Sequence, residues 1–341
     1  MNRSTITIDL SAIRANARRL RAGAGGAELW GVVKADGYGH GAIDVGRAAL
    51  EAGATALCVA TVSEALPVRD ALPEARLIVF GPSDPADVVR ARAARLELTM
   101  AGGVGPIPEG VPVHLKLDTG MGRWGLSELP APGRDVVGVM SHFASADSDR
   151  EFTQRQLDAF LDATREMSGA TRHIANSAAT LRLPAAHLDA VRCGIALYGI
   201  SPFGTDPALD GLRPALAWHS SIERVLTLAA GESTGYGRLF VAAEPTRIGI
   251  VPVGYADGFR RDLTGTEVRV AGATARVVGT VSMDALAVAL PDAAGAGDVV
   301  TLIGDEVLIE EHARVAGTIG YELACGLMPR PARMAREVRN E

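Results

Sequence analysis

The fold is indicated first by the stretch Val32-Val33-Lys34-Ala35-Asp36-Gly37-Tyr38-Gly39-His40-Gly41. An apolar run from Leu29 to Val33 ends at a lysine, and a glycine-rich polar loop then leads into a helical pattern at about residues 42–52. A strand with a charged residue at its C-terminal tip, followed by a permissive loop, is a common way of placing a reactive side chain in an α/β fold. We therefore expect Lys34 to be a functional residue.

The residue type at position 34 strengthens this expectation. Of the 34 basic residues, only Lys34 and Lys116 are lysines, and all the others are arginines. Either cation would serve on a solvated surface, but a lysine can lose its proton and attack a carbonyl, whereas a guanidinium is effectively always charged. Both lysines lie in glycine-rich polar motifs, which favours a chemical role over a surface lysine retained by chance.

Length and composition bound the class of protein. A chain of 341 residues can form one large domain and a smaller one. The net charge is −6 and no block of like charge is long, so we expect no nucleic-acid partner. Cys58, Cys193 and Cys325 lie far apart, which predicts neither a metal site nor a disulfide framework. No segment has the pattern of a signal peptide or a membrane span, so we expect a cytoplasmic protein with no membrane partner.

Strands and helices alternate through residues 1–214. We expect strands at residues 29–34, 56–62, 76–81, 96–100, 113–118, 136–142, 173–177 and 190–198. The clearest helices between them are expected at residues 42–52, 63–71, 85–94, 151–168 and 178–187. This alternation predicts an α/β fold with a (β/α)8 TIM-like barrel, whose site lies at the C-terminal ends of the strands. An additional strand at residues 5–10 can pair instead with the C-terminal domain.

Two connections of this barrel look incomplete. Residues 101–111 and 126–135 are rich in glycine and proline and too short for a full crossover helix. We expect the barrel to have one thin side there, close to Lys116 and Arg123.

The character of the chain changes after Pro214, and residues 215–341 predict a mainly β C-terminal domain. Its strands are expected at residues 218–228, 246–253, 267–270, 274–281, 285–290 and 299–303, with short glycine and aspartate turns between them. A helix is expected at residues 309–318, and the arginine-rich tail at residues 331–341 should be peripheral.

Polar motifs follow several of the predicted barrel strands. They are Lys34 with Tyr38 and His40 after the first, Lys116 to Arg123 after the fifth, Ser141-His142 after the sixth, Asn176-Ser177 after the seventh and Arg192-Cys193-Gly194-Ile195 on the eighth. A lysine, a histidine, arginines and small hydrogen-bond donors should therefore meet at one barrel mouth. Such a set suits a phosphorylated cofactor bound through a lysine imine, with serine and backbone N–H groups around the phosphate.

The motifs also carry a resemblance over nearly the whole chain. They are Val-Val-Lys-Ala-Asp-Gly-Tyr-Gly-His-Gly (32–41), Lys-Leu-Asp-Thr-Gly-Met-Gly-Arg (116–123), Ser-His-Phe-Ala-Ser-Ala-Asp (141–147), Ala-Asn-Ser-Ala-Ala (175–179), Arg-Cys-Gly-Ile-Ala-Leu-Tyr-Gly (192–199), Gly-Tyr-Gly (235–237), Gly-Tyr-Ala-Asp-Gly (254–258) and Val-Ser-Met-Asp (281–284). In this order and spacing, the chain resembles the alanine racemases of the pyridoxal-phosphate barrel type.

The resemblance implies roles for the reacting residues. Lys34 is similar to the lysine that holds pyridoxal 5'-phosphate as an aldimine and also acts as the base on the D-enantiomer. Tyr236 is similar to the second base, which acts on the L-enantiomer. Arg123 and the backbone N–H of Met283 resemble the groups that hold the substrate carboxylate. Lys116 resembles a lysine that is often carbamylated and that orients the arginine.

The resemblance implies further contacts to the cofactor and around the site. The residues similar to the phosphate contacts are Tyr38, Ser177, Gly194 and Ile195. Arg192 resembles the arginine that faces the pyridine nitrogen, and His142 resembles its neighbour. Tyr255 is expected to line the entrance, and Asp284 to lie just behind the site. Pro329 stands where the family usually has a tyrosine that also contacts the phosphate, so one hydrogen bond of about 1 kcal/mol should be missing or supplied elsewhere.

The implied function is interconversion of L- and D-alanine, which would supply D-alanine for cell-wall peptidoglycan. Removing the α-proton from one face and returning one to the other needs two bases, and Lys34 and Tyr236 fit that need. The resemblance also implies a homodimer in which each site combines one subunit's barrel with the other's β domain. The alternatives are a racemase of serine or another small amino acid, and a non-catalytic pyridoxal-phosphate-binding barrel protein.

Overall fold

The structure is a computed structural model that describes residues 3–102, 107–131, 133–327 and 332–340. It divides into two compact units. The barrel unit comprises Ala12–Phe203 and Asp210–Arg213, and the β unit comprises Met1–Ser11, Gly204–Leu209 and Pro214–Glu341. Each unit is described by itself. Within the described ranges, no helix is long and apolar enough to cross a membrane.

The barrel unit contains the predicted eight-stranded parallel sheet, in the order β8-β7-β6-β5-β4-β3-β2-β9. Its strands are β2 (Glu28–Val32), β3 (Ala56–Val59), β4 (Leu77–Val79), β5 (Glu97–Met100), β6 (Val113–Lys116), β7 (Val136–Met140), β8 (Thr171–His173) and β9 (Ala190–Cys193). Backbone hydrogen bonds from Asp189 to Arg172 and from Arg192 to Ala175 join β9 to β8 and nearly close the barrel. Every residue of β3, β6 and β9 is buried, as expected for strands covered on both faces.

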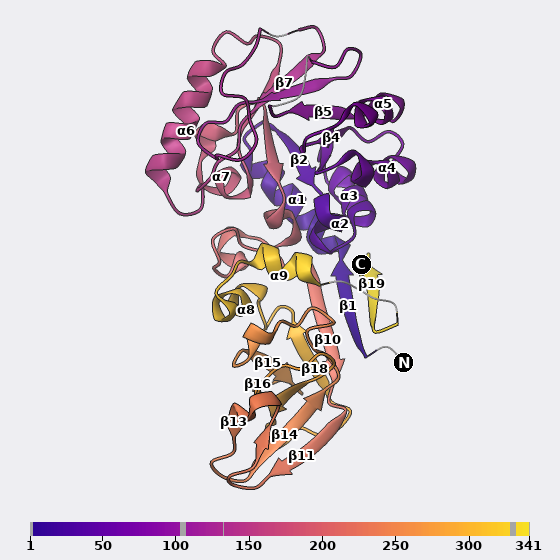
Figure 1. Cartoon of the computed structure of the whole chain (residues 1–341), viewed down its shortest axis with the longest axis vertical. Helices are drawn as coiled ribbons and strands as arrows, with labels where there is room; N and C mark the ends of the chain where they lie inside the picture. Colours follow the sequence, from indigo (N-terminus) through magenta and orange to yellow (C-terminus); the bar gives the residue numbers. More distant parts are fainter. Residues whose placement is uncertain (1–2, 103–106, 132, 328–331, 341) are drawn as a thin grey trace. The chain divides into compact units, whose positions relative to one another are not determined.

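Helices cover most of the outside of this sheet. They are α1 (Leu10–Gly23), α3 (Ala42–Glu51), α4 (Val62–Ala71), α5 (Pro85–Ala93), α6 (Arg150–Ala163) and α7 (Ser177–Arg182). Figure 1 shows α3, α4 and α5 along one side of the unit and α6 and α7 on the other. Among the described residues, no helix joins β5 to β6 or β6 to β7, so the predicted thin side is confirmed.

The strands end earlier than the sequence predicts, and this changes the backbone at the site. The predicted strand 29–34 ends at Val32, and a short left-handed turn, α2 (Lys34–Tyr38), follows. The predicted strands 173–177 and 190–198 were also too long, because Ser177 begins α7 and a 3-10 helix covers Ile195–Tyr198. Side chains explain the first difference, since Glu64 accepts the Ala35 N–H and Asp36 accepts the Ala42 N–H, each in place of a ladder partner.

The β unit is built on a nine-stranded sheet in the order β11-β14-β17-β16-β15-β18-β10-β1-β19. The strands are β1 (Ser4–Asp9), β10 (Leu216–Ser221), β11 (Arg224–Leu228), β14 (Thr246–Val251), β15 (Glu267–Val270), β16 (Ala273–Val278), β17 (Leu286–Ala289), β18 (Val299–Ile303) and β19 (Met334–Arg339). Strand β1 pairs antiparallel with β10 and parallel with β19. Helices α8 (Ile309–Ala316) and α9 (Gly320–Gly326) precede β19.

Two expectations for the β unit were wrong. The tail is not peripheral, because β19 pairs along the whole of β1 and completes the sheet edge. The predicted strand 218–228 is two strands, β10 and β11, which belong to different parts of the sheet. Alternating burial is weak in β19, where only Met334 is buried, so the pattern in the sequence did not reveal this strand.

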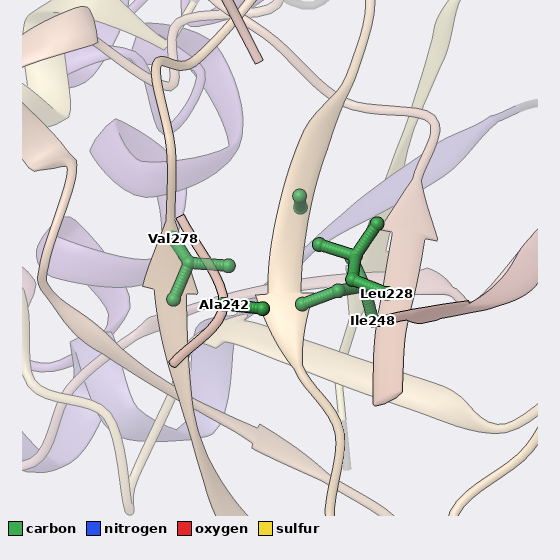
Figure 2. Close-up of a cluster of buried hydrophobic side chains, with 5 residues drawn as sticks. Leu228, Ala242, Ile248 and Val278 are labelled. Atoms are coloured by element: carbon green, nitrogen blue, oxygen red, sulfur yellow. The ribbon is translucent and has the colours of Figure 1, made fainter. Parts of the chain in front are cut away.

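A small apolar cluster supports the hairpin that contains Tyr236. Leu228, Ala242, Ile248 and Val278 lie in this cluster together with Ala287 (Figure 2). Phe240, in the short strand β13 (Phe240–Val241), packs against it, and β13 pairs with β12 (Ser233–Thr234). The segment that carries Tyr236 is therefore anchored at both ends by paired and packed residues.

Candidate active site

Lys34 lies on an unusual piece of backbone at the end of β2. Ala35, Asp36, Gly37 and Tyr38 all have positive φ, between 49° and 62°. Such a run is rare for residues with a Cβ and costs energy, so the surrounding contacts must maintain it. Glu64 holds the start of the turn through the N–H groups of Ala35 and Ala60. The turn carries the half-buried Lys34 at its start and the buried Tyr38 at its end.

Tyr38 meets the segment that follows β9. A Cβ on Gly194 would collide with the Tyr38 hydroxyl, so only glycine allows this close approach. The N–H groups of Gly194 and Ala196 both donate to Ser177 Oγ, at 3.1 and 3.3 Å. The structure thus brings together the Tyr38 and Ser177 hydroxyls and the backbone at Gly194 and Ile195, the residues that resemble phosphate contacts in the sequence.

Arg192 lies fully inside the barrel, where its guanidinium donates to four groups. Its partners are His173 Nδ1 at 2.9 Å, Ser141 O at 2.8 Å, Ile174 O at 3.1 Å and His142 Nδ1 at 3.2 Å. Burial lowers the pKa of Arg192 to about 10, which leaves the group protonated at neutral pH. Burial, followed by the nearby Arg192 and Arg123 charges, holds the pKa of His142 well below its ordinary value.

The contact to His173 begins a polar chain that crosses the barrel interior. Because a guanidinium only donates, His173 Nδ1 must accept, and a neutral His173 therefore carries its proton on Nε2. This proton is donated to His114 Nδ1 at 2.9 Å, and His114 Nε2 donates to Glu97 at 2.7 Å. Burial opposes ionisation of Glu97, but hydrogen bonds from His114 and Arg76 outweigh it and lower its pKa to about 2.

The buried histidines predict a loss of stability in mild acid. Burial lowers the pKa of both His114 and His173, whereas both protonate near pH 6.5 in the unfolded chain. Their contribution is therefore present above pH 6.5 and is lost as the pH falls towards each folded-state pKa, with a limiting slope of about 1.4 kcal/mol per pH unit for each histidine. Urea unfolding at pH 7.5, 6.0 and 5.0 should show this slope, and His173→Gln should make it shallower. Equal slopes for the two proteins would contradict the assignment.

Lys116 and Arg123 stand at the end of β6 and in the loop after it. Lys116 is buried, and burial together with the Arg123 and Arg192 charges lowers its pKa to about 8. Arg123 is exposed and lies over the Trp124 ring, at 5.3 Å from its centroid. Asp118 shapes the loop, because its carboxylate accepts the N–H groups of residues 120, 121 and 122. The loop geometry therefore depends on Asp118 rather than on a helix.

The other predicted site residues belong to the β unit. Tyr236 is 73% exposed, and its carbonyl accepts a hydrogen bond from Thr280 Oγ1 at 2.7 Å. The loops that carry Tyr255 and Met283 lie together, since Tyr255 N donates to Ser282 O and Ala256 N donates to Met283 O. Asp284 forms an ion pair with Arg333. Pro329 lies outside the described residues.

Sequence reasoning missed several residues that build the site. His173 and His114 are not among the predicted site residues, although His173 contacts Arg192 directly. Glu64 and Asp118 were not identified as the acceptors that shape the two loops. A lone carboxylate near a glycine-rich loop is a possible signal for Asp118, but nothing local marks Glu64, which lies 29 residues after its partner Ala35.

The fold and the residues gathered at the barrel mouth define a barrel-type enzyme with a second, β-rich domain. The profile of the alanine racemase N-terminal domain matches residues 8–202, and that of the C-terminal domain matches residues 215–335. The alanine racemase of Laribacter hongkongensis is 42% identical, over 96% of this chain and 97% of the relative. The chain belongs to the alanine racemase family.

Solved structures agree with this membership. The biosynthetic alanine racemase of Pseudomonas aeruginosa superposes with a TM-score of 0.91 at 37% identity, over 99% of this chain and 100% of that one. An alanine racemase from Bartonella henselae, solved with covalently bound pyridoxal phosphate, superposes with a TM-score of 0.88 at 25% identity, over 99% and 100% of the two chains. Both likenesses span the barrel and the β unit.

Proposed function

We propose that the protein interconverts L- and D-alanine with pyridoxal 5'-phosphate bound covalently to Lys34. The observation that carries this proposal is the left-handed turn that begins at Lys34 and brings the Tyr38 hydroxyl close to Gly194, whose N–H donates to Ser177. Family membership supports the reaction, and the covalently bound pyridoxal phosphate of the Bartonella henselae relative supports the cofactor.

The charges at the barrel mouth fit an anionic cofactor. Lys34, Arg123 and Arg192 all lower the pKa of Lys116, whereas Asp118 is the neighbour that raises it. The Asp118 carboxylate already accepts three backbone N–H groups. A cluster of cations at one barrel mouth favours a bound phosphate and a carboxylate substrate.

The residues of this chain have distinct roles in the proposed proton transfer. Bound pyridoxal phosphate supplies an electron-withdrawing ring that weakens the bond between the α-carbon and its hydrogen. Arg192 only donates, so it would keep the ring nitrogen of the bound cofactor in the unprotonated, accepting state, and His142 and His173 accept from Arg192 while they stay neutral. Lys34 removes or returns the α-proton on the face used by D-alanine, and Tyr236 does so on the face used by L-alanine.

The substrate carboxylate needs fixed donors so that its α-carbon lies between the two bases. We assign this role to the Arg123 guanidinium and the Met283 N–H, with Tyr255 at the entrance. Lys116 orients Arg123, and its carbamylation would replace a cation by an anion that can accept from the guanidinium. Because Lys116 and Arg123 otherwise repel, this change also removes a like-charge contact.

Carbamylation of Lys116 can be tested directly. Carbon dioxide reacts with a neutral amine, and a pKa of about 8 leaves a far larger neutral fraction at pH 7.5 than an ordinary lysine has. Protein equilibrated with 13C-bicarbonate should show a carbamate signal by 13C NMR, and Lys116→Met should lack it. The signal should persist in Lys34→Ala. A signal that is lost in Lys34→Ala but kept in Lys116→Met would show that the carbamate is on Lys34, which would contradict the proposal.

The two bases lie in different units, and we propose that two copies of the chain complete each site. The β unit exposes Tyr236, Leu239 and Met283, at 73%, 75% and 52%. Large exposed apolar side chains near a reactive tyrosine suit a surface that a second copy covers. A homodimer would then place Tyr236 of one copy near Lys34 of the other.

The activity itself is tested by incubating the purified protein with L-alanine, L-serine and the cofactor and measuring the D-product. We expect D-alanine to form much faster than D-serine, which would suit supply of D-alanine for peptidoglycan. Faster production of D-serine would assign the protein to serine. An absence of both D-products, with cofactor bound, would leave only a pyridoxal-phosphate-binding barrel protein.

A further inference from the structure

Two loops of the β unit are fastened together around Met283. The Tyr255 N–H donates to Ser282 O at 3.0 Å, and the Ala256 N–H donates to Met283 O at 3.1 Å. A Cβ on Gly254 would collide with the carbonyl oxygens of Ser282 and Met283, so the loops approach as closely as glycine allows. The loop at residues 254–257 therefore holds the two carbonyl groups on either side of the Met283 α-carbon.

These hydrogen bonds also set the direction of the Met283 N–H. The Ser282 carbonyl and the Met283 N–H belong to one trans peptide unit, in which the two groups point in opposite directions. Because the Ser282 carbonyl points at Tyr255, the Met283 N–H points away from the 254–257 loop. In the described part of the chain, this N–H donates to no other backbone group.

One guanidinium connects the two loops through their carboxylates. Arg333 Nε and Nη2 bind both oxygens of the buried Asp257, at 2.7 and 3.0 Å. Arg333 Nη2 also lies 2.8 Å from Asp284 Oδ1, on the residue next to Met283. Asp257 in turn accepts the Gly254 N–H at 3.0 Å. The Arg333 guanidinium is therefore connected, through Asp257, to the start of the first loop.

The edge of the sheet holds Arg333 in place. The Arg3 N–H donates to the Arg333 carbonyl at 3.1 Å, just before the pairing of β1 with β19 begins. The Arg3 side chain donates to the Asp284 carbonyl. The arginine that joins the loops is thus fixed by the strand that the sequence did not reveal.

We propose that Arg333 is a positioning residue for substrate binding, which acts through Asp257 and Asp284 to aim the Met283 N–H at the substrate carboxylate. This inference rests on the proposed function of Met283. A guanidinium holds two carboxylates through a planar fork, whereas an ammonium is a point charge that cannot hold both in the same geometry. Weakening the contacts of Arg333 with Asp257 and Asp284 should therefore lower the affinity for the substrate carboxylate without removing either base.

The test is a kinetic comparison of two arginine-to-lysine variants of the holoenzyme. Arg333→Lys should raise KM for L- and D-alanine about tenfold and leave kcat within about threefold, as expected for loss of a carboxylate contact. The inhibition constant of lactate, which has the carboxylate but no amine, should rise by about the same factor. Arg247→Lys is the matched control, because Arg247 clamps the carbonyls of residues 291, 292 and 294 in the same unit.

The outcomes separate positioning from a structural role. If Arg333→Lys lowers Tm but leaves KM and the lactate constant as they are in Arg247→Lys, Arg333 is structural and the proposal is wrong. Asp284→Asn keeps the fork to Asp257, so it supplies a milder variant if Arg333→Lys does not fold, and it should raise both constants about threefold. Unchanged constants in Asp284→Asn would equally overturn the proposal. Failure of the proposed function would appear instead as an inactive wild-type protein.

Discussion

Replacing Lys34 by arginine should abolish racemisation, with a fall in kcat/KM on the order of 10⁴-fold or more. The guanidinium retains the positive charge but stays protonated, so it can neither bond covalently to the cofactor nor act as a base. Lys34 is the first residue of the left-handed turn, and the positive φ angles begin at Ala35, so arginine is compatible with the backbone there. The protein should remain folded while losing covalently held cofactor, which absorbance after gel filtration would detect.

A second substitution separates chemistry from packing at the same position. Lys34→Ala should be as inactive as Lys34→Arg, but added methylamine should restore part of its activity because a small amine can occupy the vacated space. Lys34→Arg should gain nothing from methylamine. If Lys34→Arg kept racemase activity within about tenfold of the wild type, the role assigned to Lys34 would be wrong.

Replacing Tyr236 by phenylalanine should lower kcat/KM about 10³-fold, the range expected for loss of one general acid–base group. Tyr236 is exposed in its own unit and only its backbone carbonyl accepts from Thr280, so deleting the hydroxyl should leave the fold intact. The equilibrium constant between enantiomers is one, so kcat/KM must fall equally in both directions. The direction of the reaction therefore cannot reveal which base was lost.

Hydrogen exchange in D2O can reveal which of the two bases was lost. With Lys34 intact, Tyr236→Phe should remove the α-proton of D-alanine and return a deuteron to the same face, which gives exchange without inversion. L-alanine should exchange far more slowly, because its α-proton faces the missing hydroxyl. Mass spectrometry of the two recovered enantiomers measures both rates, and faster exchange of L-alanine would reverse the assignment of the bases.

Much of the fold was readable from the sequence because it rests on local patterns. The strands of the barrel are short, largely buried runs separated by helices, several of which have Thr, Asp or Asn at their N-termini, and these signals need no tertiary information. Strand β19 was not readable, since its pairing with β1 joins residues more than 300 positions apart and its side chains are mostly exposed. Pairing of that kind leaves little trace in either segment alone.

The candidate site was likewise only partly predictable from the sequence. Lys34 could be suspected from residue type alone, because it is a lysine in a chain that otherwise uses arginine. The left-handed turn after Lys34 could not, since three of its four positive-φ residues are alanine, aspartate and tyrosine rather than glycine. The hydrogen-bond chain from Arg192 to Glu97 and the fork of Arg333 were also hidden, because each joins residues from distant strands or loops.

The central claim is that one site uses Lys34 of one copy and Tyr236 of another. The most direct test mixes the inactive Lys34→Ala and Tyr236→Phe proteins under conditions that allow subunits to exchange, with cofactor present. Half of the randomly mixed dimers would contain one copy of each, and one of their two sites would be intact, so activity should return to about a quarter of the wild-type value. If each chain forms its own site, mixing restores nothing, and an inactive mixture of demonstrably exchanged subunits would contradict this account.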